Sequence, residues 1–360
     1  MKIFYAVQAT GNGHISRAVE ILPYLQEYGD VDIFLSGSNF DLKKGIPIAY
    51  RSKGLSLAYD QKKGSIDLWK TFIQARPKKI WREAKYLPIE KYDIVINDFE
   101  CITSLACKLK NIPSVHFGHQ ASFRSPKVPR PMNKNFKGEF ILSHFASGTK
   151  TIGLHFKKYD SFIHQPIIKK SILESYPNDK GHITVYVGQY SLAHLMKIFK
   201  QLKSFTFHLF TNEAVSAYQE NNIRVIPINQ DSFNQSLINC HGIITGAGFE
   251  TPAEALYLGK KLMVIPIAGQ YEQECNAVAL SKDFNATSLK RIDEFFPVYF
   301  NKWIFDSQPS RLYLQESTRD IVKNVFTSTQ TKEVASQVQS TIPMRSATAW
   351  HPNLERTKSN

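Results

Sequence analysis

Short apolar runs alternate with amphipathic stretches along the chain, and this alternation occurs once in each half. The runs typical of strands are Lys2–Ala9, Val31–Ser36, Ile46–Tyr50, Tyr92–Asn97 and Ser114–Gly118, then His182–Gly188, Thr206–Phe210, Arg224–Ile228, Gly242–Thr245 and Lys261–Pro266. The stretches typical of helices are Arg17–Tyr28, Ile102–Lys110, Leu192–Lys203, Phe233–Asn239 and Thr251–Leu258. Strands that alternate with helices over short connections form parallel sheets covered by helices on both faces. We therefore predict an α/β protein of two Rossmann-like domains that face a central cleft, with ligands at the carboxyl ends of the strands.

The boundary between the two domains is predicted within residues 164–180, where Pro166 and Pro177 interrupt a polar stretch. A chain of 360 residues is long enough for two domains of about 150 residues each. Near its end the sequence is rich in Ser, Thr, Gln and Lys and has little apolar periodicity, so we expect a weakly ordered tail at residues 327–360.

Composition narrows the class of protein. The chain is 42% hydrophobic and 21% charged, as folded soluble proteins are, and it has no apolar run of the roughly 20 residues that span a bilayer. Its first residues run directly into a strand, without the apolar segment of a signal peptide, so we expect a cytoplasmic protein. Its four cysteines lack CxxC spacing, which predicts reduced thiols rather than a metal site.

The formal net charge of +14 is concentrated in the first half of the chain. Residues 1–163 contain 25 Lys and Arg against 14 Asp and Glu, a net charge of +11, whereas the remaining residues contain 20 against 17. This excess indicates either an anionic partner, such as acidic lipid headgroups, a lipid-phosphate acceptor or an acidic glycan, or simply a solvated basic surface. Nucleic acid is not an expected partner, because the basic residues are scattered and no binding motif accompanies them.

The segment Phe123–Gly138 contributes to this basic character. It contains five Lys and Arg, three prolines and no acidic residue. Because prolines disfavour a helix, we predict an exposed loop here. In that loop Arg124, Lys127 and Arg130 either contact the acceptor or a membrane, or are ordinary surface residues.

Two glycine-rich turns each follow an apolar strand and open a helix. The first is Thr10-Gly11-Asn12-Gly13, which precedes His14, and the second is Gly246-Ala247-Gly248-Phe249, which precedes Glu250 and Thr251. Backbone N–H groups at a helix start bind anions or substrate oxygens when no bulky side chain blocks their approach. The two turns therefore predict two nucleotide-fold domains with their binding edges toward one cleft.

The first turn matches neither of two common phosphate-binding motifs. The loop of NTPases ends in Gly-Lys-Ser/Thr, whereas Gly13 precedes His14 here. The dinucleotide motif needs a small third residue, where this chain has Ser16, and an acidic residue after the second strand, where it has Ser36-Gly37-Ser38. What remains is a turn that presents a histidine at the head of a helix, and imidazole suits proton transfer near neutral pH.

With these two turns and an acidic residue inside the second helix, the chain resembles the two-domain, GT-B-type nucleotide-sugar glycosyltransferases. It is most similar to the bacterial peptidoglycan UDP-GlcNAc transferase and its uncharacterised relatives, over roughly residues 1–325 and most strongly over Gly242–Asn276. The resemblance implies an acceptor-binding domain at 1–165, a nucleotide-sugar-binding domain at 166–310 and a helix at 311–326 that crosses back to the first domain.

The resemblance implies that His14 is the catalytic base, because the matching histidine is the proposed base of the family. A carboxylate that orients the imidazole is expected at the end of a neighbouring strand, where Asp98 matches the family's acidic partner. Glu100 lies two residues further on and stays an alternative partner. In the competing interpretation His14 is a polar cap of its turn and Asp98 caps the following helix.

The resemblance also implies a donor site at the second turn. The amides and the positive end of the helix would hold the donor's diphosphate, and Glu254 would bind both ribose hydroxyls; alternatively, Thr251 and Glu254 form a capping box. Contacts to the donor nucleotide and phosphate are expected from Gly188, Gln189, Ile228, Gly246, Ala247, Gly248, Phe249, Glu250, Thr251 and Glu254.

Contacts to the donor sugar are expected from Gln270, Glu272, Gln273 and Asn276, which the family pattern matches. This segment is one residue shorter than in the peptidoglycan enzyme, so either Gln270 or Glu272 faces the sugar. A plain polar helix start is the alternative. The chain has no Asp-x-Asp motif, so no metal and no cofactor is expected beyond the UDP-sugar co-substrate, and the helix end would stabilise the leaving diphosphate.

The predicted function is an inverting, metal-independent glycosyltransferase that moves a hexose of GlcNAc type from a UDP-sugar to an acceptor hydroxyl. The charge asymmetry adds the hypothesis of a lipid-linked or membrane-proximal acceptor and of peripheral contact with the inner face of the cell membrane, as in the synthesis of a cell-envelope glycan. An epimerase or hydrolase of the same architecture and a non-catalytic nucleotide-sugar-binding protein stay as alternatives. A Rossmann dehydrogenase is disfavoured by the motif failures above.

Overall fold

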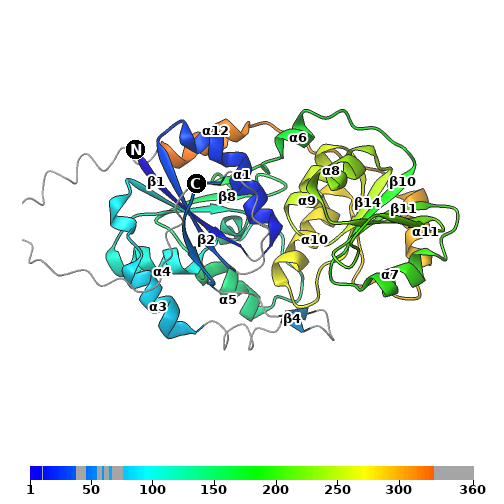
Figure 1. Ribbon diagram of the computed structural model, residues 1–360, viewed down its shortest axis with the longest axis horizontal. Coiled ribbons are helices and arrows are strands. Elements are labelled where there is room, and N and C mark those ends of the chain that lie inside the picture. Colours follow the sequence, from blue (N-terminus) through cyan, green and yellow to red (C-terminus); the bar gives the residue numbers. More distant parts are fainter. Residues whose placement is uncertain (10, 38–45, 55–58, 61–64, 67–75, 328–360) are drawn as a thin grey trace, which may run out of the picture.

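The computed structural model describes residues 1–9, 11–37, 46–54, 59–60, 65–66 and 76–327. These residues form two halves that lie side by side, each built on one seven-stranded sheet with helices packed against it (Figure 1). Neighbouring strands are parallel throughout the first sheet and in all but one pair of the second. The predicted fold class, α/β with two Rossmann-like halves, is therefore confirmed.

The sheet of the first half has the strand order β3-β2-β1-β6-β7-β8-β9. Its strands are β1 (Lys2–Gln8), β2 (Asp30–Ser36), β3 (Ile48–Ser52), β6 (Ile94–Asp98), β7 (Val115–Gly118), β8 (Lys150–Leu154) and β9 (Ile163–His164); β4 (Tyr59–Asp60) and β5 (Ser65–Ile66) form a separate antiparallel pair. The helical elements are α1 (Asn12–Gln26), α3 (Pro77–Tyr86), η1 (Ile89–Lys91), α4 (Cys101–Lys110), η2 (Gln120–Arg124) and α5 (Phe136–His144).

Alternation along β1 explains why helices cover both faces of this sheet. Tyr5 and Val7 belong to the buried cluster formed with α1, whereas Phe4 and Ala6 belong to the cluster formed with α3 and α4. Successive side chains of a strand point to opposite faces, so an almost continuous apolar run requires cover on both sides.

The sheet of the second half has the order β12-β13-β11-β10-β14-β15-β16, in which β12 pairs antiparallel at the edge. Its strands are β10 (His182–Tyr186), β11 (Thr206–Thr211), β12 (Tyr218–Glu220), β13 (Ile223–Pro227), β14 (Gly242–Thr245), β15 (Lys261–Val264) and β16 (Thr287–Ser288). The helices are α6 (Lys170–Leu173), α7 (Leu192–Phe199), α8 (Gln230–Asn239), α9 (Glu250–Tyr257), α10 (Tyr271–Phe284) and α11 (Phe296–Asp306).

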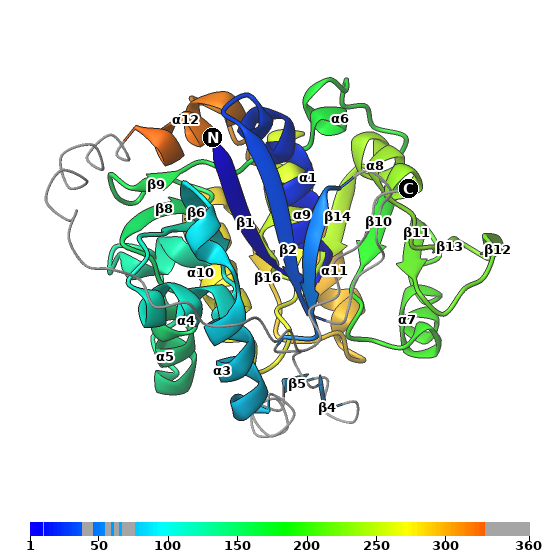
Figure 2. The same cartoon turned by 60° about the vertical axis from the view of Figure 1, so that its left-hand side comes forward.

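The last described helix, α12 (Thr318–Phe326), returns to the first half and packs on α1. Both views place it near the N-terminus (Figure 1, Figure 2), and the ring of Phe326 stacks on Tyr28 with 3.9 Å between centroids. The expectation of a helix from residue 311 is wrong, because Ser317 and Asp320 form a capping box that starts the helix at Thr318. The predicted tail at 327–360 lies outside the described residues from 328 onward.

The halves are joined by apolar and polar contacts. One buried cluster contains β1 and α1 side chains of the first half together with β14, α9 and α10 side chains of the second. At its rim, the hydroxyl of Tyr271 donates to Glu139 (2.7 Å) and that of Tyr159 donates to Asp283 (2.6 Å). None of the helices in the described part of the chain is long and apolar enough to cross a membrane.

Candidate functional site

The first glycine-rich turn presents its histidine from the start of α1. Gly11 is the N-cap, and a β-carbon added there would meet no described atom within 4 Å. A β-carbon on Gly13, by contrast, would lie 2.5 Å from a carboxylate oxygen of Glu250 in the second half. Gly11, Asn12 and Gly13 therefore form a turn against which the other half closes. Thr10, also predicted in this turn, lies outside the described residues.

His14 and Asp98 are in direct contact, as a base and its orienting carboxylate would be. The Nδ1 atom of His14 lies 2.8 Å from Oδ1 of Asp98, which is fully buried at the end of β6. Strand β6 runs parallel to β1 with Asp98 opposite Val7, so the end of β6 lies where the chain leaves β1 toward α1. The Nε2 atom of His14 lies 3.4 Å from the amide nitrogen of Gln120.

Glu100, the alternative partner of the histidine, has a different role. Its carboxylate accepts hydrogen bonds from the backbone N–H groups of Ile102 (2.9 Å) and Thr103 (2.6 Å), and so caps α4. The interpretation of Asp98 as the cap of this helix is therefore wrong. Burial raises the pKa of Glu100, although the same two amides act in the opposite direction.

Asp98 is surrounded by donors that keep it ionised. Nε and Nη2 of Arg17 donate to its two oxygens at 2.9 and 2.8 Å, and the hydroxyl of Tyr5 donates to Oδ2 at 3.2 Å. Burial alone would raise the pKa of Asp98, but the charges of Arg17 and His14 outweigh it and hold this pKa well below its ordinary value. The carboxylate is thus a permanent acceptor for the imidazole N–H.

The second glycine-rich turn connects β14 to α9. The helix begins at Glu250, one residue earlier than predicted, and among the described residues no side chain caps it. A β-carbon on Gly248 or Gly188 would meet no described atom within 4 Å, so space is open at both turns. On the other side of the turn, the ring of Phe249 stacks on His119 of the first half, with centroids 4.0 Å apart. This arrangement leaves helix-start amides free to meet an anion.

Glu254 lies one turn inside α9 and is 1% exposed. Its carboxylate pairs with Nζ of Lys169 at 3.1 Å. The alternative of a capping box with Thr251 is wrong, because Phe249 is the N-cap and makes no side-chain hydrogen bond to the helix in the described structure. Burial raises the pKa of Glu254 to about 7, although the charge of Lys169 acts in the opposite direction. Near neutral pH this carboxyl is thus close to the midpoint of its titration.

The four residues predicted to contact the donor sugar lie at the start of α10 but have different surroundings. Glu272 accepts a hydrogen bond from Gln120 of the first half (2.9 Å). Gln273 instead accepts from the backbone N–H of Ile267 within its own half (3.0 Å). Gln270 precedes α10 as its N-cap, and its Oε1 is buried without a partner among the described residues.

Asn276 reaches further toward the first half. Its Oδ1 lies 2.8 Å from Nε2 of His119, and its Nδ2 donates to the carbonyl of Ala247 in the second turn (3.1 Å). Between the two candidates left open above, Glu272 is the one directed at the first half. Both Glu272 and Asn276 therefore lie where the two halves meet.

The remaining predicted donor contacts lie at neighbouring strand ends. The side chain of Gln189 donates to the carbonyl of Ile265 (3.1 Å), which fixes it beside β15. Ile228 follows β13, and its backbone N–H donates to the carbonyl of Thr211 (3.2 Å). The structure therefore brings Gln189 and the second turn to the same edge of the sheet as predicted from the alternation of elements.

Sequence reasoning missed four residues of this site: Tyr5, Arg17, His119 and Gln120. Arg17 lies three residues after His14, and that spacing on a helix puts both on one face. His119 and Gln120 directly follow β7, the strand next to β6, so the rule that ligands lie at the carboxyl ends of strands would have found them.

The basic segment Phe123–Gly138 differs from the predicted exposed loop. Phe123 and Val128 are buried, and α5 begins at Phe136, with the side chain of Asn135 as its cap. Arg130 is bound to Glu139 (2.7 Å) and to two backbone carbonyls, whereas Lys127 pairs with Asp160 (3.2 Å). Of the three basic residues predicted to contact a partner, only Arg124 is left as an exposed residue without an ion pair in the described structure. The prolines prevented a helix only up to residue 135.

The cysteines and acidic residues suggest no further chemistry. Cys107, Cys240 and Cys275 are buried, Cys101 is partly buried, and all four are free thiols. Burial raises the pKa of each of these thiols, so they are poor nucleophiles. In the described part of the chain, no group of three or more His, Cys, Asp or Glu is arranged to hold a metal ion.

Comparisons with known proteins give the family of the chain and proteins of similar fold. A family model described as "Glycosyl transferase family 1" matches residues 1–295, and a search among curated proteins found no match. The solved structure of LpCGTa in complex with UDP is 14% identical, covers 94% of this chain and 99% of its own, and has a TM-score of 0.55. The spinosyn forosaminyltransferase SpnP is 13% identical, with coverages of 92% and 99% and a TM-score of 0.52. MurG of Acinetobacter baumannii is 15% identical, with coverages of 92% and 95% and a TM-score of 0.49.

Proposed function

The chain belongs to glycosyl transferase family 1, and from this premise we propose that it transfers a sugar from a UDP-sugar to an acceptor hydroxyl with inversion at the anomeric carbon. One observation carries the proposal: the pair His14–Asp98 of the first half meets the start of α9 in the second half through Arg17 and Glu250. Such a transfer requires a base and an anion-binding helix end on opposite sides of one contact.

In the proposed reaction Asp98 accepts the Nδ1–H of His14, which leaves Nε2 as the proton acceptor. His14 takes the proton of the acceptor hydroxyl while its oxygen forms a bond to the anomeric carbon of the donor. The bond between that carbon and the diphosphate oxygen breaks on the opposite side. The negative charge of the departing UDP develops at the amides of Gly248–Thr251, where the positive end of α9 stabilises it.

We assign UDP as the nucleotide and Glu254 as the residue that binds its ribose hydroxyls. LpCGTa, whose fold this chain shares, was solved with UDP, and the resemblance of residues Gly242–Asn276 to the peptidoglycan enzyme supports a sugar of GlcNAc type. Glu272 and Asn276 would contact the sugar from their place between the halves. Lys169, which holds Glu254 in the ligand-free protein, is the group that a bound ribose would have to displace or share.

The test is a thermal-shift panel of UDP, GDP, TDP and their sugars. A ligand at about 100 times its dissociation constant stabilises the folded state by about 2.7 kcal/mol, so the correct nucleotide raises the melting temperature measurably. Glu254→Ala should lose this shift. The matched control is Glu294→Ala, which removes an exposed carboxylate outside the site. An equal shift in Glu254→Ala and wild type would contradict the assignment of the ribose contact.

Measurements of turnover distinguish the proposed glycosyltransferase from the alternative functions. A glycosyltransferase consumes the donor only when a hydroxyl acceptor is present, and His14→Ala should abolish this acceptor-dependent consumption. A hydrolase or epimerase of the same fold would release or convert the sugar without any acceptor. A binding protein would show the thermal shift but no turnover in either variant.

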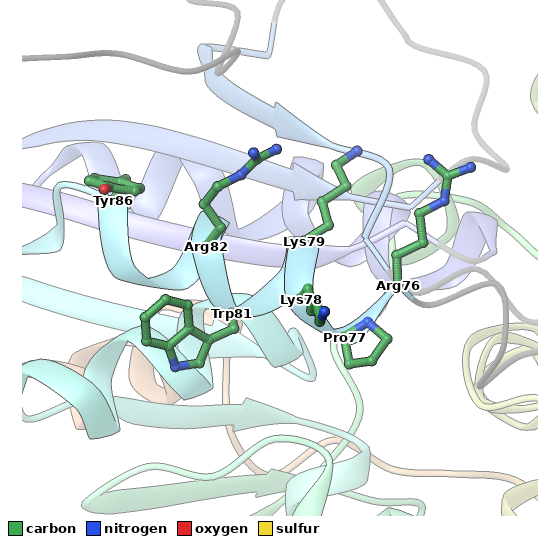
Figure 3. A pocket seen from close by; sticks show the side chains of 7 residues that line it. All are labelled: Arg76, Pro77, Lys78, Lys79, Trp81, Arg82 and Tyr86. Carbon is green, nitrogen blue, oxygen red and sulfur yellow. The ribbon is translucent and has the colours of Figure 1, made fainter.

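We further infer that the first half contacts an anionic membrane, on which a lipid-linked acceptor would be found. Helix α3 carries Trp81 and Tyr86, each about half exposed, and Nζ of Lys85 lies over both rings. We call α3, whose place in the first half is seen in Figure 2, the basic-aromatic surface. Its open hollow is lined by Arg76, Pro77, Lys78, Lys79, Trp81, Arg82 and Tyr86 (Figure 3).

The chemistry of this surface fits a lipid interface. Figure 3 shows Arg76, Lys79 and Arg82 extending to one side of α3 and Trp81 to the other. Basic side chains near an anionic leaflet gain about 1 kcal/mol each, while aromatic rings settle at the depth of the headgroups. The basic-aromatic surface therefore replaces Lys127 and Arg130 as the expected membrane contact.

A further inference from the structure

Arg17 is the one guanidinium in the described site that is bound by a carboxylate from each half. Within the first half, its Nε and Nη2 atoms donate to both oxygens of Asp98. Across the contact, its Nη1 atom forms an ion pair with Glu250. Arg17 is 3% exposed and Asp98 is fully buried, so water does little to screen this network.

The same guanidinium reaches the imidazole of His14. Nη2 of Arg17 lies 2.9 Å from Nδ1 of His14, and that Nδ1 also lies 2.8 Å from Oδ1 of Asp98. A ring nitrogen cannot donate to a carboxylate and accept from a guanidinium at once. If Nδ1–H donates to Asp98, Nε2 is free to accept a proton; if Nδ1 accepts from Arg17, Nε2 carries the hydrogen and cannot act as a base. The position of Arg17 thus decides which tautomer is favoured.

We propose that Arg17 is a positioning residue that sets the tautomer of His14 according to whether Glu250 of the second half is in contact with it. This inference rests on the proposed function, because it presumes that His14 is the base. In this structure Glu250 is bound to Nη1, and Nη2 lies within hydrogen-bonding distance of both Oδ1 of Asp98 and Nδ1 of His14. The bond to Glu250 and the two bonds to Asp98 fix the plane of the guanidinium, so that Nη2 donates to Asp98 and the Nδ1–H of His14 goes to the same carboxylate. Without Glu250 one of these anchors is lost, and Nη2 can direct a hydrogen at the Nδ1 atom that it already approaches.

Glu250 connects this contact to the proposed donor site. Glu250 is the first residue of α9, the helix whose free amides are assigned to the donor diphosphate. Its negative charge beside that site would repel a diphosphate unless it is paired, and Arg17 supplies the pairing. The base in one half and the donor site in the other are therefore coupled through a single side chain.

Three substitutions perturb this coupling in different ways. Arg17→Lys keeps the charge but replaces a planar fork by a point charge that cannot bind Asp98 through two atoms and Glu250 as well. Glu250→Gln keeps the size and removes the charge. Gly13→Ala places a β-carbon 2.5 Å from a Glu250 oxygen, so it pushes that carboxylate away while leaving every charge in place.

The test measures kcat, KM for the donor and the pH–rate profile of these variants, with UDP binding followed by thermal shift. We expect kcat of Arg17→Lys and Gly13→Ala to fall by about 100-fold, the scale of a base misplaced by roughly 1 Å. Donor KM of Glu250→Gln should change far less, since the amides of α9 are intact and no unpaired carboxylate is left beside them. Donor KM of Gly13→Ala should also rise, because Glu250 keeps its charge beside the diphosphate site without its partner. The double variant Gly13→Ala/Glu250→Gln should lose no more kcat than the more damaging single variant, because both substitutions break the same contact between Arg17 and Glu250.

The pH–rate profile is the readout that a merely structural role would not move. The groups that face His14 are Asp98 from β6, Arg17 from α1, Glu250 from α9, Tyr5 through Asp98, and Glu272 through Gln120. In Glu250→Gln the guanidinium loses its second carboxylate, so its positive charge disfavours the imidazolium and the acid limb should move to lower pH. An acid limb that stays in place, or an Arg17→Lys enzyme with kcat within about twofold of wild type, would overturn the inference. If the wild-type protein neither bound UDP nor turned over a UDP-sugar, the proposed function would be overturned instead.

Discussion

The proposed ribose contact of Glu254 predicts that donor binding depends on pH. With a pKa of about 7, its ionised fraction rises from about one tenth at pH 6 to about nine tenths at pH 8. Only the ionised form accepts hydrogen bonds from two ribose hydroxyls, so UDP affinity should increase about tenfold over this range. Titration calorimetry at several pH values checks this. Glu254→Gln is the control, because the titration of UDP's own phosphate is common to both proteins.

The same carboxyl affects the stability of the ligand-free protein with a defined sign. Its pKa in the folded protein lies above that of an unfolded glutamate, so the unfolded state binds fewer protons between about pH 4.5 and 7. The contribution of Glu254 to the free energy of unfolding is therefore fully present below about pH 4.5 and is lost as the pH rises through 7. Melting curves of wild type and Glu254→Gln should diverge in this window; parallel curves would show that Lys169 keeps the carboxylate ionised.

Asp98 and Glu100 are two buried acids, close in sequence, that should respond differently to substitution. Asp98→Asn removes the acceptor that fixes the His14 tautomer, so kcat should fall by about 100-fold or more. Glu100→Ala removes the cap of α4 and should cost about 1 kcal/mol of stability while kcat is kept. Urea unfolding and initial rates measure both. If Glu100→Ala lowered kcat and Asp98→Asn lowered only the stability, the assignment of the two roles would be wrong.

At the residue scale the sequence could predict the contact between His14 and Asp98 but not its surroundings. A buried strand followed by an acid predicts either a partner for His14 or a helix cap, and only the placement of both acids shows that Asp98 is the partner and Glu100 the cap. Arg17 was missed because its partners lie 81 and 233 residues away in the chain. No local spacing encodes such contacts.

At the element scale, two glycines, one in a turn and one in a strand, should differ in their tolerance of a side chain. A β-carbon on Gly248 meets no described atom within 4 Å, so Gly248→Ala should fold normally yet weaken UDP binding by blocking approach to the α9 amides. A β-carbon on Gly153 in β8 would lie 2.7 Å from the backbone of Ser122. Gly153→Ala should therefore lose stability by about 1–3 kcal/mol. Thermal unfolding with and without UDP distinguishes the two outcomes.

The type of most elements could be predicted from the sequence, and their ends could not. Apolar runs found β1, β2, β10 and β14 within two residues of their observed bounds, because a strand buried on both faces must be apolar throughout. The helix expected from residue 311 begins at Thr318 instead, because the capping box starts it there. The residues before it are not helical, and Tyr313 and Gln315 bond to Gln165. Similarly, α5 starts at Phe136, after the prolines, where the side chain of Asn135 caps it.

At the scale of the whole molecule, the charge asymmetry leads to a prediction about membranes. Wild-type protein should sediment with vesicles of anionic phospholipid and not with purely zwitterionic vesicles. Replacing Lys78, Lys79 and Arg82 by Glu should reduce binding by about 3 kcal/mol or more, roughly 100-fold, and raised salt should do the same. The triple substitution Lys180→Glu, Lys282→Glu and Lys290→Glu, at exposed positions of the second half, is the matched charge control. Binding that persists in the α3 variant would remove the basic-aromatic surface as the contact.

How the halves meet could be predicted only in outline. Two glycine turns at strand ends indicated a shared cleft, and the resemblance indicated which turn serves the donor. The stacking of Phe249 on His119 and the bond between Gln120 and Glu272 depend on side chains from the two halves meeting in three dimensions. A single sequence contains no pattern that predicts such pairs. It does predict the fold class, because strands and helices alternate repeatedly along both halves of the chain.

The chain passes between the halves twice, once after β9 and once before α12, and the side chain of Gln165 fastens the two passages together by bonding to the carbonyl of Tyr313 (2.8 Å) and the N–H of Gln315 (2.6 Å). Because both crossings are tied together at Gln165, we expect any movement of the two halves relative to each other to turn about this point. The contact between Arg17 and Glu250 would then re-form in the same way after each such movement. Gln165→Ala should leave both halves folded but make the re-formation of that contact less precise.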